Sequence, residues 1–293
     1  MSSTQITLLK KYGLEVRGFR GQHLLIDPNI QRKIVEWVGP KPDEWIVEIG
    51  PGLGALTGQI LAAGACVIAV EKDKRFCEIL EGEFGGDYKG RLWIENADIL
   101  KTDLEKLIKG ARRFFPAGKI RKPQKKIKVV SNLPYYITSP VLFWLIASRT
   151  QVEKAILMMQ REVATRLLAQ PGDKDYGRLT LGVRYYAEVH RAFDVSRNCF
   201  TPRPDVDSTV VTIDFHLASK FPKGVDENFI FHLIQTAFGA RRKTLLNRLS
   251  HDSRIGRSRE EILKVLEGLG IPPRTRAEEL LLKDFIALAQ ELN

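Results

Sequence analysis

A glycine-rich loop carries the clearest chemical signal in the sequence. The segment Val47–Gly54 (VEIGPGLG) follows a predicted strand, Trp45–Ile49, and precedes a predicted helix, Ala55–Ala63. Glycines in such a loop let the chain turn sharply and bring backbone N–H groups against a ligand. We expect a bound cofactor to contact the three glycines of this loop: Gly50, Gly52 and Gly54.

Three details bear on which cofactor this loop would hold. Its spacing is GxGxG, whereas dinucleotide enzymes use GxGxxG. Pro51 removes a backbone donor that a pyrophosphate could use. Glu71 ends the next predicted strand, where a carboxylate can accept hydrogen bonds from both ribose hydroxyls and would repel a 2′-phosphate. S-adenosylmethionine therefore fits best, and NAD, FAD or a purely structural turn stay as alternatives.

Asp98 follows the third predicted strand, and two interpretations of it are equal on position alone. Loops after the carboxyl ends of parallel strands line one crevice. Asp98 could accept a hydrogen bond from the adenine amino group, with Ile99 against the face of the ring. Alternatively Asp98 is a helix N-cap, since aspartate is favoured there.

A second motif follows the fourth predicted strand and suits methylation of an exocyclic amine. The lone pair of such a nitrogen is delocalised into the purine ring, so the nitrogen is a poor nucleophile. The side-chain oxygen of Asn132 and the carbonyl of Leu133 could accept the amino hydrogens and favour a tetrahedral nitrogen. Pro134 fixes the turn that aims this carbonyl, and Tyr135 offers a stacking face. A sulfonium donor is already activated, so positioning suffices and no general base is needed. The alternative is an ordinary Asn-Pro turn.

Short apolar runs alternate with helical periods, which predicts an α/β fold with a doubly wound parallel sheet. The expected strands are Trp45–Ile49, Cys66–Val70, Arg91–Asn96, Ile127–Ser131, Lys154–Met159, Thr180–Tyr186, Glu188–Val195 and Val210–Phe215. The expected helices between them are residues 29–38, Ala55–Ala63, Lys74–Glu83, Pro140–Ala147 and Arg161–Gln170.

Strand patterns vanish from about Ser219 onward. The expected helices there are Asp226–Phe238, Arg242–Leu249, Glu260–Leu269 and Ala277–Leu292. We therefore predict a Rossmann-like methyltransferase domain over residues 1–218 and a small all-α domain over residues 219–293.

Composition indicates a globular protein with a polyanionic partner. Among 293 residues, 46 Lys and Arg against 35 Asp and Glu give a net charge of +11, which favours nucleic acid first and an anionic membrane second. No apolar stretch approaches the length of a membrane span. Two basic runs, Lys109–Lys128 and Arg241–Arg259, indicate phosphate contacts rather than merely solvated surfaces; we expect the first to be an exposed loop. Three cysteines without metal-ligand spacing predict no metal site and a reduced, cytoplasmic protein.

Together these motifs resemble the family of ribosomal RNA adenine N6,N6-dimethyltransferases that modify small-subunit rRNA. The resemblance runs from about Gly18 to Leu249. The stretches that carry it are Gly21–Asp27, Val47–Gly54, Asn132–Tyr136, Gln160–Leu167, Tyr176–Leu179, Phe200–Ser208 and Ala237–Leu245.

The resemblance implies two methyl transfers to each of two adjacent adenosines in the 3′-terminal hairpin loop of 16S-type rRNA. It places His23, Leu25 and Asn132 at the cofactor beside Gly50, Glu71 and Asp98, and it favours the adenine role for Asp98. We also assign to this site Gln22 and Lys72, which flank His23 and Glu71 in the chain. The residues that would hold the target base are Asn132, Leu133, Pro134, Tyr135 and Phe200. The residues that would contact rRNA phosphates are Arg241, Arg242 and Lys243.

Several alternatives stay open at this point. Phe200 could be a core aromatic near a strand end, and Gln160–Glu162 could simply open a helix. His23 stands where the family usually has Asn, and the run Lys109–Lys128 is longer than expected. Rival functions are an enzyme acting on large-subunit rRNA, a non-catalytic RNA-binding assembly or transcription factor on the same fold, and a small-molecule or protein amine methyltransferase. A second role of the enzyme, such as gating subunit maturation, also stays open. We expect a monomer, because no exposed apolar stripe stands out, and a substrate that is rRNA within a partly assembled subunit.

Overall fold

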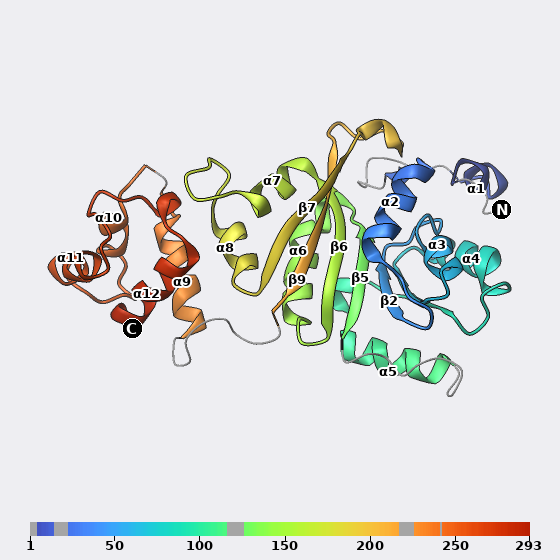
Figure 1. Ribbon diagram of the computed structural model, residues 1–293, viewed down its shortest axis with the longest axis horizontal. Helices are drawn as coiled ribbons and strands as arrows, with labels where there is room; N and C mark the ends of the chain where they lie inside the picture. The colour runs from blue at the N-terminus through green and yellow to red at the C-terminus, as the bar shows by residue number, and fades with distance from the viewer. Residues whose placement is uncertain (1–4, 15–22, 116–125, 217–225, 241) are drawn as a thin grey trace. The chain divides into compact units, whose positions relative to one another are not determined.

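A seven-stranded sheet is the central element of the first of two compact units (Figure 1). This computed structural model describes residues 5–14, 23–115, 126–216, 226–240 and 242–293. The strand order is β4-β3-β2-β5-β6-β9-β7. The strands are β2 (Trp45–Ile49), β3 (Cys66–Glu71), β4 (Leu92–Asn96), β5 (Ile127–Asn132), β6 (Val152–Gln160), β7 (Ala187–Val195) and β9 (Ser208–Phe215).

The strands from β4 through β6 pair in parallel, so their carboxyl ends meet at one edge of the sheet. Strands β2 and β3 are buried along their whole lengths, which requires cover on both faces. Helices α2 (Pro28–Val38) and α3 (Thr57–Ala62) pack on one face, within a core cluster that includes Ile46, Val67 and Val130. The predicted doubly wound, Rossmann-like α/β fold is confirmed.

Local sequence explains where several helices begin and end. The Asp27 side chain accepts hydrogen bonds from the N–H groups of Asn29 and Ile30 and thereby starts α2. Gly39 ends α2 in the left-handed conformation. Asp73 caps the helix that follows β3 in the same way. The other helices of this unit are α1 (Gln5–Lys11), α4 (Lys74–Leu80), α5 (Leu104–Phe114), α6 (Thr138–Ala147) and the start of α7 (Arg161–Leu168).

A short antiparallel pair joins β1 (Leu24–Leu25) to β8 (Phe200–Thr201). It brings together two segments that lie far apart in the sequence, so the region around residue 24 is held beside the segment that precedes β9. Across the described residues, no helix combines the length and the apolar character needed to cross a bilayer.

The second compact unit consists of helices. It contains Thr165–Glu188 and the described residues from His216 to Asn293. Its remaining helices are α8 (Arg178–Arg184), α9 (Glu227–Ala237), α10 (Leu245–Leu249), α11 (Arg259–Gly268) and α12 (Leu282–Leu292). Tyr176 is buried there, and its hydroxyl donates to the carbonyl of Leu280. This unit has two segments, because side chains near Tyr176 complete the core of the C-terminal helices. The predicted domain boundary near residue 218 stays a prediction.

Three expectations about elements were wrong. The predicted strand Thr180–Tyr186 is mostly helix α8, in which the Thr180 hydroxyl accepts from the N–H of Gly177 and donates to the carbonyl of Arg166. The sheet is not wholly parallel, since β9 runs antiparallel to β6; an apolar run marks a buried strand but not its direction. The run Lys109–Lys128 is not one loop, because α5 extends to Phe114 and β5 begins at Ile127, while residues 116–125 lie outside the described residues.

Gly54 gives a testable constraint on the glycine-rich loop. Its φ is +77°, and a Cβ there would lie 2.4 Å from Cε2 of Phe84. We expect Gly54→Ala to lower the free energy of unfolding by about 3 kcal/mol, from backbone strain and steric overlap together. Chemical denaturation measures this loss.

Gly39→Ala is the matched control for this substitution. Gly39 also has a positive φ, of +55°, but the nearest atom to its added Cβ would be 3.8 Å away. Its cost should be the backbone cost alone, about 1 kcal/mol. Equal losses in the two variants would show that steric overlap with Phe84 does not contribute to the loss of stability in Gly54→Ala.

Candidate active site

A cavity of about 640 Å³ opens at the edge where the parallel strands end. Each of the loops that follow β2, β3, β4 and β5 contributes to its wall, which is the arrangement expected at the carboxyl edge of such a sheet. The predicted site residues that line it are His23, Leu25, Gly50, Gly52, Glu71, Lys72, Asp98, Ile99, Asn132, Leu133, Pro134 and Tyr135. The structure thus brings the two sequence motifs into one cavity.

Glu71 is the buried carboxylate of this cavity, with 7% of its surface exposed. Its Oε2 accepts the N–H of Gly52 at 3.2 Å, and its Oε1 accepts the N–H of Asp73 at 2.9 Å. Burial raises the pKa of Glu71, although these backbone hydrogen bonds oppose the rise. The side chain therefore joins the glycine-rich loop to the start of α4, and its remaining lone pairs can accept donors from a ligand.

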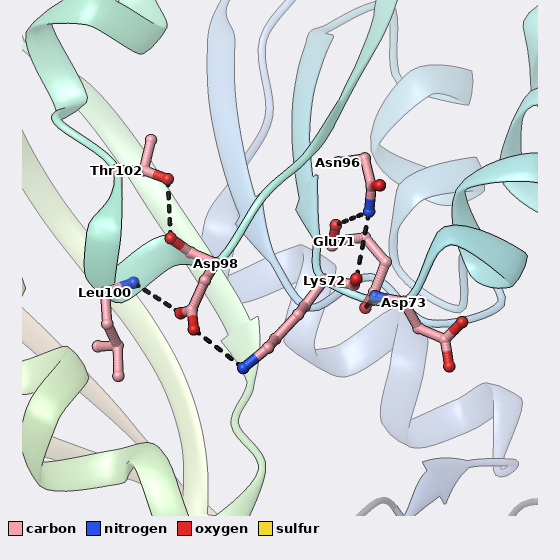
Figure 2. Close-up of polar contacts among 7 residues, drawn as sticks. All are labelled: Glu71, Lys72, Asp73, Asn96, Asp98, Leu100 and Thr102. Atoms are coloured by element: carbon pink, nitrogen blue, oxygen red, sulfur yellow. Dashed lines mark hydrogen bonds and ion pairs between the residues drawn. The ribbon is translucent and has the colours of Figure 1, made fainter.

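Asp98 lines the same cavity as Glu71, and Figure 2 shows its polar contacts. These contacts are compatible with both roles considered from sequence, the helix N-cap and the acceptor for an adenine amine. Its Oδ1 accepts the N–H of Leu100 at 3.1 Å, so it caps the short 3-10 turn Ile99–Lys101. Its Oδ2 accepts Lys72 Nζ at 2.9 Å, and this bond lowers the pKa of the Asp98 carboxyl. The side chain is 23% exposed and faces the cavity, so a ligand amino group can reach it.

Asn96 fixes the spacing of the two loops that carry Glu71 and Asp98. Its Nδ2 donates to the backbone carbonyls of Glu71 at 2.9 Å and of Lys72 at 3.2 Å, as Figure 2 shows. Because Asn96 ends β4 and Glu71 ends β3, this amide ties the ends of neighbouring strands together.

The Asn132 side chain is oriented by the backbone of His23. Its Nδ2 donates to the His23 carbonyl at 3.2 Å. Because a carbonyl can only accept, this contact fixes which end of the amide is nitrogen and leaves Oδ1 as an acceptor. His23 itself is held by a contact of 2.6 Å between its Nδ1 and the Pro202 carbonyl, so Nδ1 carries the proton. Its ring lies 5.3 Å from the ring of Tyr135, measured between centroids.

The turn that follows Asn132 is anchored at both ends. The N–H of Leu133 donates to the Met158 carbonyl of the adjacent strand at 3.1 Å. Tyr135 is half-buried, and its hydroxyl lies 3.1 Å from Oγ of Ser208, the first residue of β9. Burial raises the pKa of this hydroxyl. The ring of Tyr135 is therefore held in place at the cavity rather than free to rotate.

Glu48 is a second buried carboxyl at the cavity, and the sequence analysis gave it no role. It is 2% exposed, and Thr57 Oγ1 donates to its Oε2 at 2.6 Å. Burial raises the pKa of Glu48 to about 7, and the neighbouring charge of Glu71 adds to the rise. A charged residue inside the otherwise apolar strand Trp45–Ile49 was the available signal for it.

Some predicted residues lie elsewhere. Gly54 does not line the cavity, because it packs against Phe84. Phe200 is 4% exposed in a core cluster and does not line the cavity either, which matches the alternative of a core aromatic near a strand end. Gln22 and Arg241 lie outside the described residues.

The basic runs differ in how much charge they present. Arg242 and Lys243 are exposed just before α10. In the other run, Lys109 and Arg112 lie on the exposed side of α5. Lys128 does not contribute, because it is mostly buried and pairs with Glu44 at 3.1 Å.

Further residues that line the cavity were not singled out from sequence, among them Gln5, Leu100, Phe76 and Tyr136. Tyr136 is 65% exposed, and an exposed aromatic next to a predicted stacking residue was a signal for it. Gln5 belongs to α1, which the sequence analysis did not predict, and no local pattern links it to a loop almost fifty residues later.

Comparison with known proteins gives a consistent family. The family model described as ribosomal RNA adenine dimethylase matches residues 13–293. A protein of Moorella thermoacetica named ribosomal RNA small subunit methyltransferase A is 40% identical over 287 residues, which cover 98% of this chain and 96% of that relative. A protein of the same name from Geobacillus sp. (strain WCH70) is 38% identical over 97% of this chain and 94% of its own length.

Solved structures agree with the fold. A dimethyladenosine transferase from Plasmodium falciparum superposes with a TM-score of 0.75 and 29% identity, over 92% of this chain and 97% of that one. A 23S rRNA methyltransferase, ErmE, superposes with a TM-score of 0.67 over 92% of this chain and 99% of that one. Because the two chains are only 22% identical, this comparison supports the fold alone.

The raised pKa of Glu48 predicts a pH-dependent stability. The folded protein keeps a proton on Glu48 up to about pH 7, whereas the unfolded chain loses it near pH 4.3. Stability contributed by this group is therefore full below the unfolded pKa and declines as pH rises to about 7, by about 4 kcal/mol in total. We expect Glu48→Gln to remove this decline and to be more stable than the parent chain at pH 8.

Urea denaturation of the unliganded protein at pH 5 and pH 8 measures this effect. Glutamine keeps an acceptor for the Thr57 hydroxyl, so the comparison isolates the titration. Glu36→Gln, at an exposed position of α2, is the control and should leave the pH dependence as it is. If parent and Glu48→Gln lose stability equally between the two pH values, Glu48 does not titrate in this range.

Proposed function

Since this chain belongs to the ribosomal RNA adenine dimethylase family and is an S-adenosylmethionine-dependent rRNA adenine dimethyltransferase, we propose that its targets are two adjacent adenosines in the 3′-terminal hairpin loop of small-subunit rRNA. The relatives that are 38–40% identical over nearly the whole chain carry names that refer to the small subunit, which supports this choice over the large subunit. The observation that carries the proposal is the shared cavity of Glu71, Asp98 and Asn132.

The chemistry of the cavity fits the cofactor. S-adenosylmethionine has hydrogen-bond donors at its ribose, its adenine amine and its ammonium, and it supplies an activated methyl group when bound. The cavity offers acceptors to match these donors: carboxyl oxygens of Glu48, Glu71 and Asp98, and a buried side-chain oxygen of Gln5 that has no partner among the described residues. We propose that Glu71 accepts the ribose hydroxyls and that Asp98 accepts the adenine amine, with Lys72 and Ile99 beside it.

The motif at residues 132–135 would hold the amine that is methylated. The Oδ1 of Asn132 and the carbonyl of Leu133 accept the two amino hydrogens, which lets the nitrogen lone pair leave conjugation with the purine. Tyr135, fixed by its hydroxyl contact with Ser208, stacks on the base. Adenosines of a hairpin loop are unpaired, so moving one into the cavity costs a few kcal/mol at most.

Exposed basic residues would bind the rRNA backbone. We propose this role for Arg242 and Lys243, and for Lys109 and Arg112 on α5. The family relation together with a net charge of +11 supports rRNA as the substrate, and a partly assembled subunit in the cytoplasm is the form and place we propose for it.

Methyl transfer to unmethylated small subunits, followed by mapping of dimethyladenosine, tests the proposed substrate. We expect label at two adjacent adenosines of the 3′-terminal hairpin. Label confined to large-subunit rRNA would contradict the proposed target while leaving the family activity intact.

Asn132→Ala should abolish transfer. Loss of the side-chain acceptor leaves the amino nitrogen conjugated, and removal of one such preorganised group typically costs a factor of about 10²–10³. Cofactor affinity, measured by calorimetry, should change by less than about threefold. Asn198→Ala, at an exposed amide of the same chain, is the control. Full activity of Asn132→Ala would eliminate the positioning argument.

Glu71→Ala should weaken cofactor binding by at least about tenfold, because the buried carboxylate that would accept both ribose hydroxyls is lost. Calorimetric titration with S-adenosylmethionine measures the change. Glu78→Ala removes the same charge from the exposed side of α4 and should bind like the parent. An unchanged affinity in Glu71→Ala would refute its contact with the ribose.

A further inference from the structure

Helix α1 forms part of the cavity wall, although the family model begins only at residue 13. The residue of α1 that lines the cavity is Gln5, which is 5% exposed. Its Nε2 donates to the carbonyl of Leu53, in the glycine-rich loop, at 3.3 Å. A side chain from the start of the described chain is thus bonded to the loop that would hold the cofactor.

Independent contacts hold α1 in this position. Leu8 is 1% exposed and belongs to a core cluster with Leu53 and Phe76. At the end of α1, Lys11 and the hydroxyl of Tyr12 both bond to Oε1 of Glu83, which follows α4. The position of Gln5 therefore does not depend on its own weak hydrogen bond.

The side-chain oxygen of Gln5 is a buried acceptor without a partner. The amide is oriented by the Leu53 carbonyl, because an oxygen in place of Nε2 would face another acceptor. In that orientation Oε1 is buried and accepts no hydrogen bond within the described residues. An unsatisfied buried acceptor destabilises a protein, and Gln5 is one of the residues that line the cavity, so a ligand donor that enters beside this side chain would complete the acceptor.

We propose that Gln5 is a cofactor-binding residue, whose Oε1 accepts a hydrogen bond from a donor of S-adenosylmethionine, and that α1 is a wall of the cofactor site. The inference rests on the cofactor site proposed above. Only donors can satisfy Oε1, so the carboxylate and the sulfonium of the cofactor are excluded as its partner. The ribose hydroxyls, the adenine amine and the ammonium are the groups that share the required chemistry.

Gln5→Met tests this role, because methionine has a similar length and no polar oxygen. We expect its affinity for S-adenosylmethionine and S-adenosylhomocysteine, measured by calorimetry, to fall about threefold to tenfold. We also expect the melting temperature of the unliganded variant to change little, since removal of the unsatisfied Oε1 offsets the loss of the hydrogen bond from Nε2 to the Leu53 carbonyl. A residue with only a structural role would lower the melting temperature and leave the affinity unchanged, and that result would overturn the proposal.

Titration with 5′-methylthioadenosine identifies the donor, since this nucleoside keeps the adenine and ribose but lacks the amino acid. If 5′-methylthioadenosine binds Gln5→Met more weakly than it binds the parent chain, the donor belongs to the ribose or the adenine. If its affinity is unchanged in Gln5→Met while the affinity for S-adenosylmethionine falls, the donor is the ammonium group.

Two controls separate Gln5 from its helix. Ile6→Ala changes an exposed side chain of α1, so it should bind the cofactor like the parent. Leu8→Ala loosens α1 without changing any acceptor of the cavity. If Leu8→Ala weakens binding as much as Gln5→Met does, the packing of α1 and not the Gln5 oxygen matters, and the proposal fails. Failure of the parent chain itself to bind the cofactor would instead contradict the proposed function.

Discussion

The buried carboxylate of Glu71 is the interaction on which the site depends. It accepts backbone hydrogen bonds from Gly52 in the glycine-rich loop and from Asp73 at the start of α4. Both groups follow strands that pair in parallel, and the carboxylate links the two loops. Asn96 extends this connection to the end of β4 through the carbonyls of Glu71 and Lys72. Three strand ends are thereby tied into one rigid rim around the cavity.

Acidic side chains are buried at this rim, and their burial is unfavourable for folding. Glu48 and Glu71 are both buried, and burial raises the pKa of each. Gln5 adds a buried oxygen that accepts no hydrogen bond from the part of the chain that the structure describes. A purely structural loop would gain stability from apolar residues at these positions. The accumulation of acceptors is explained by a ligand rich in donors, and it is consistent with the common trade between stability and binding at functional sites.

The side of the cavity that would receive the target base has a different character. Asn132, Leu133 and Tyr135 are held by hydrogen bonds to His23, Met158 and Ser208, which come from three separate parts of the chain. None of these contacts uses the Oδ1 of Asn132. The geometry thus orients an acceptor and a ring before any substrate binds, which suits a reaction that depends on positioning rather than on proton abstraction.

Sequence alone determined the chemistry of the two motifs and most of the parallel sheet. Gly50, Gly52, Glu71, Asp98 and Asn132 could be assigned to one cavity because parallel strands end at a common edge. Only the tertiary structure decided the direction of β9, the helical state of Thr180–Tyr186, and the burial of Phe200 away from the cavity, because each depends on partners distant in the chain. The same reason hid Gln5: its neighbour in space is Leu53, and no local periodicity encodes a contact across 48 positions.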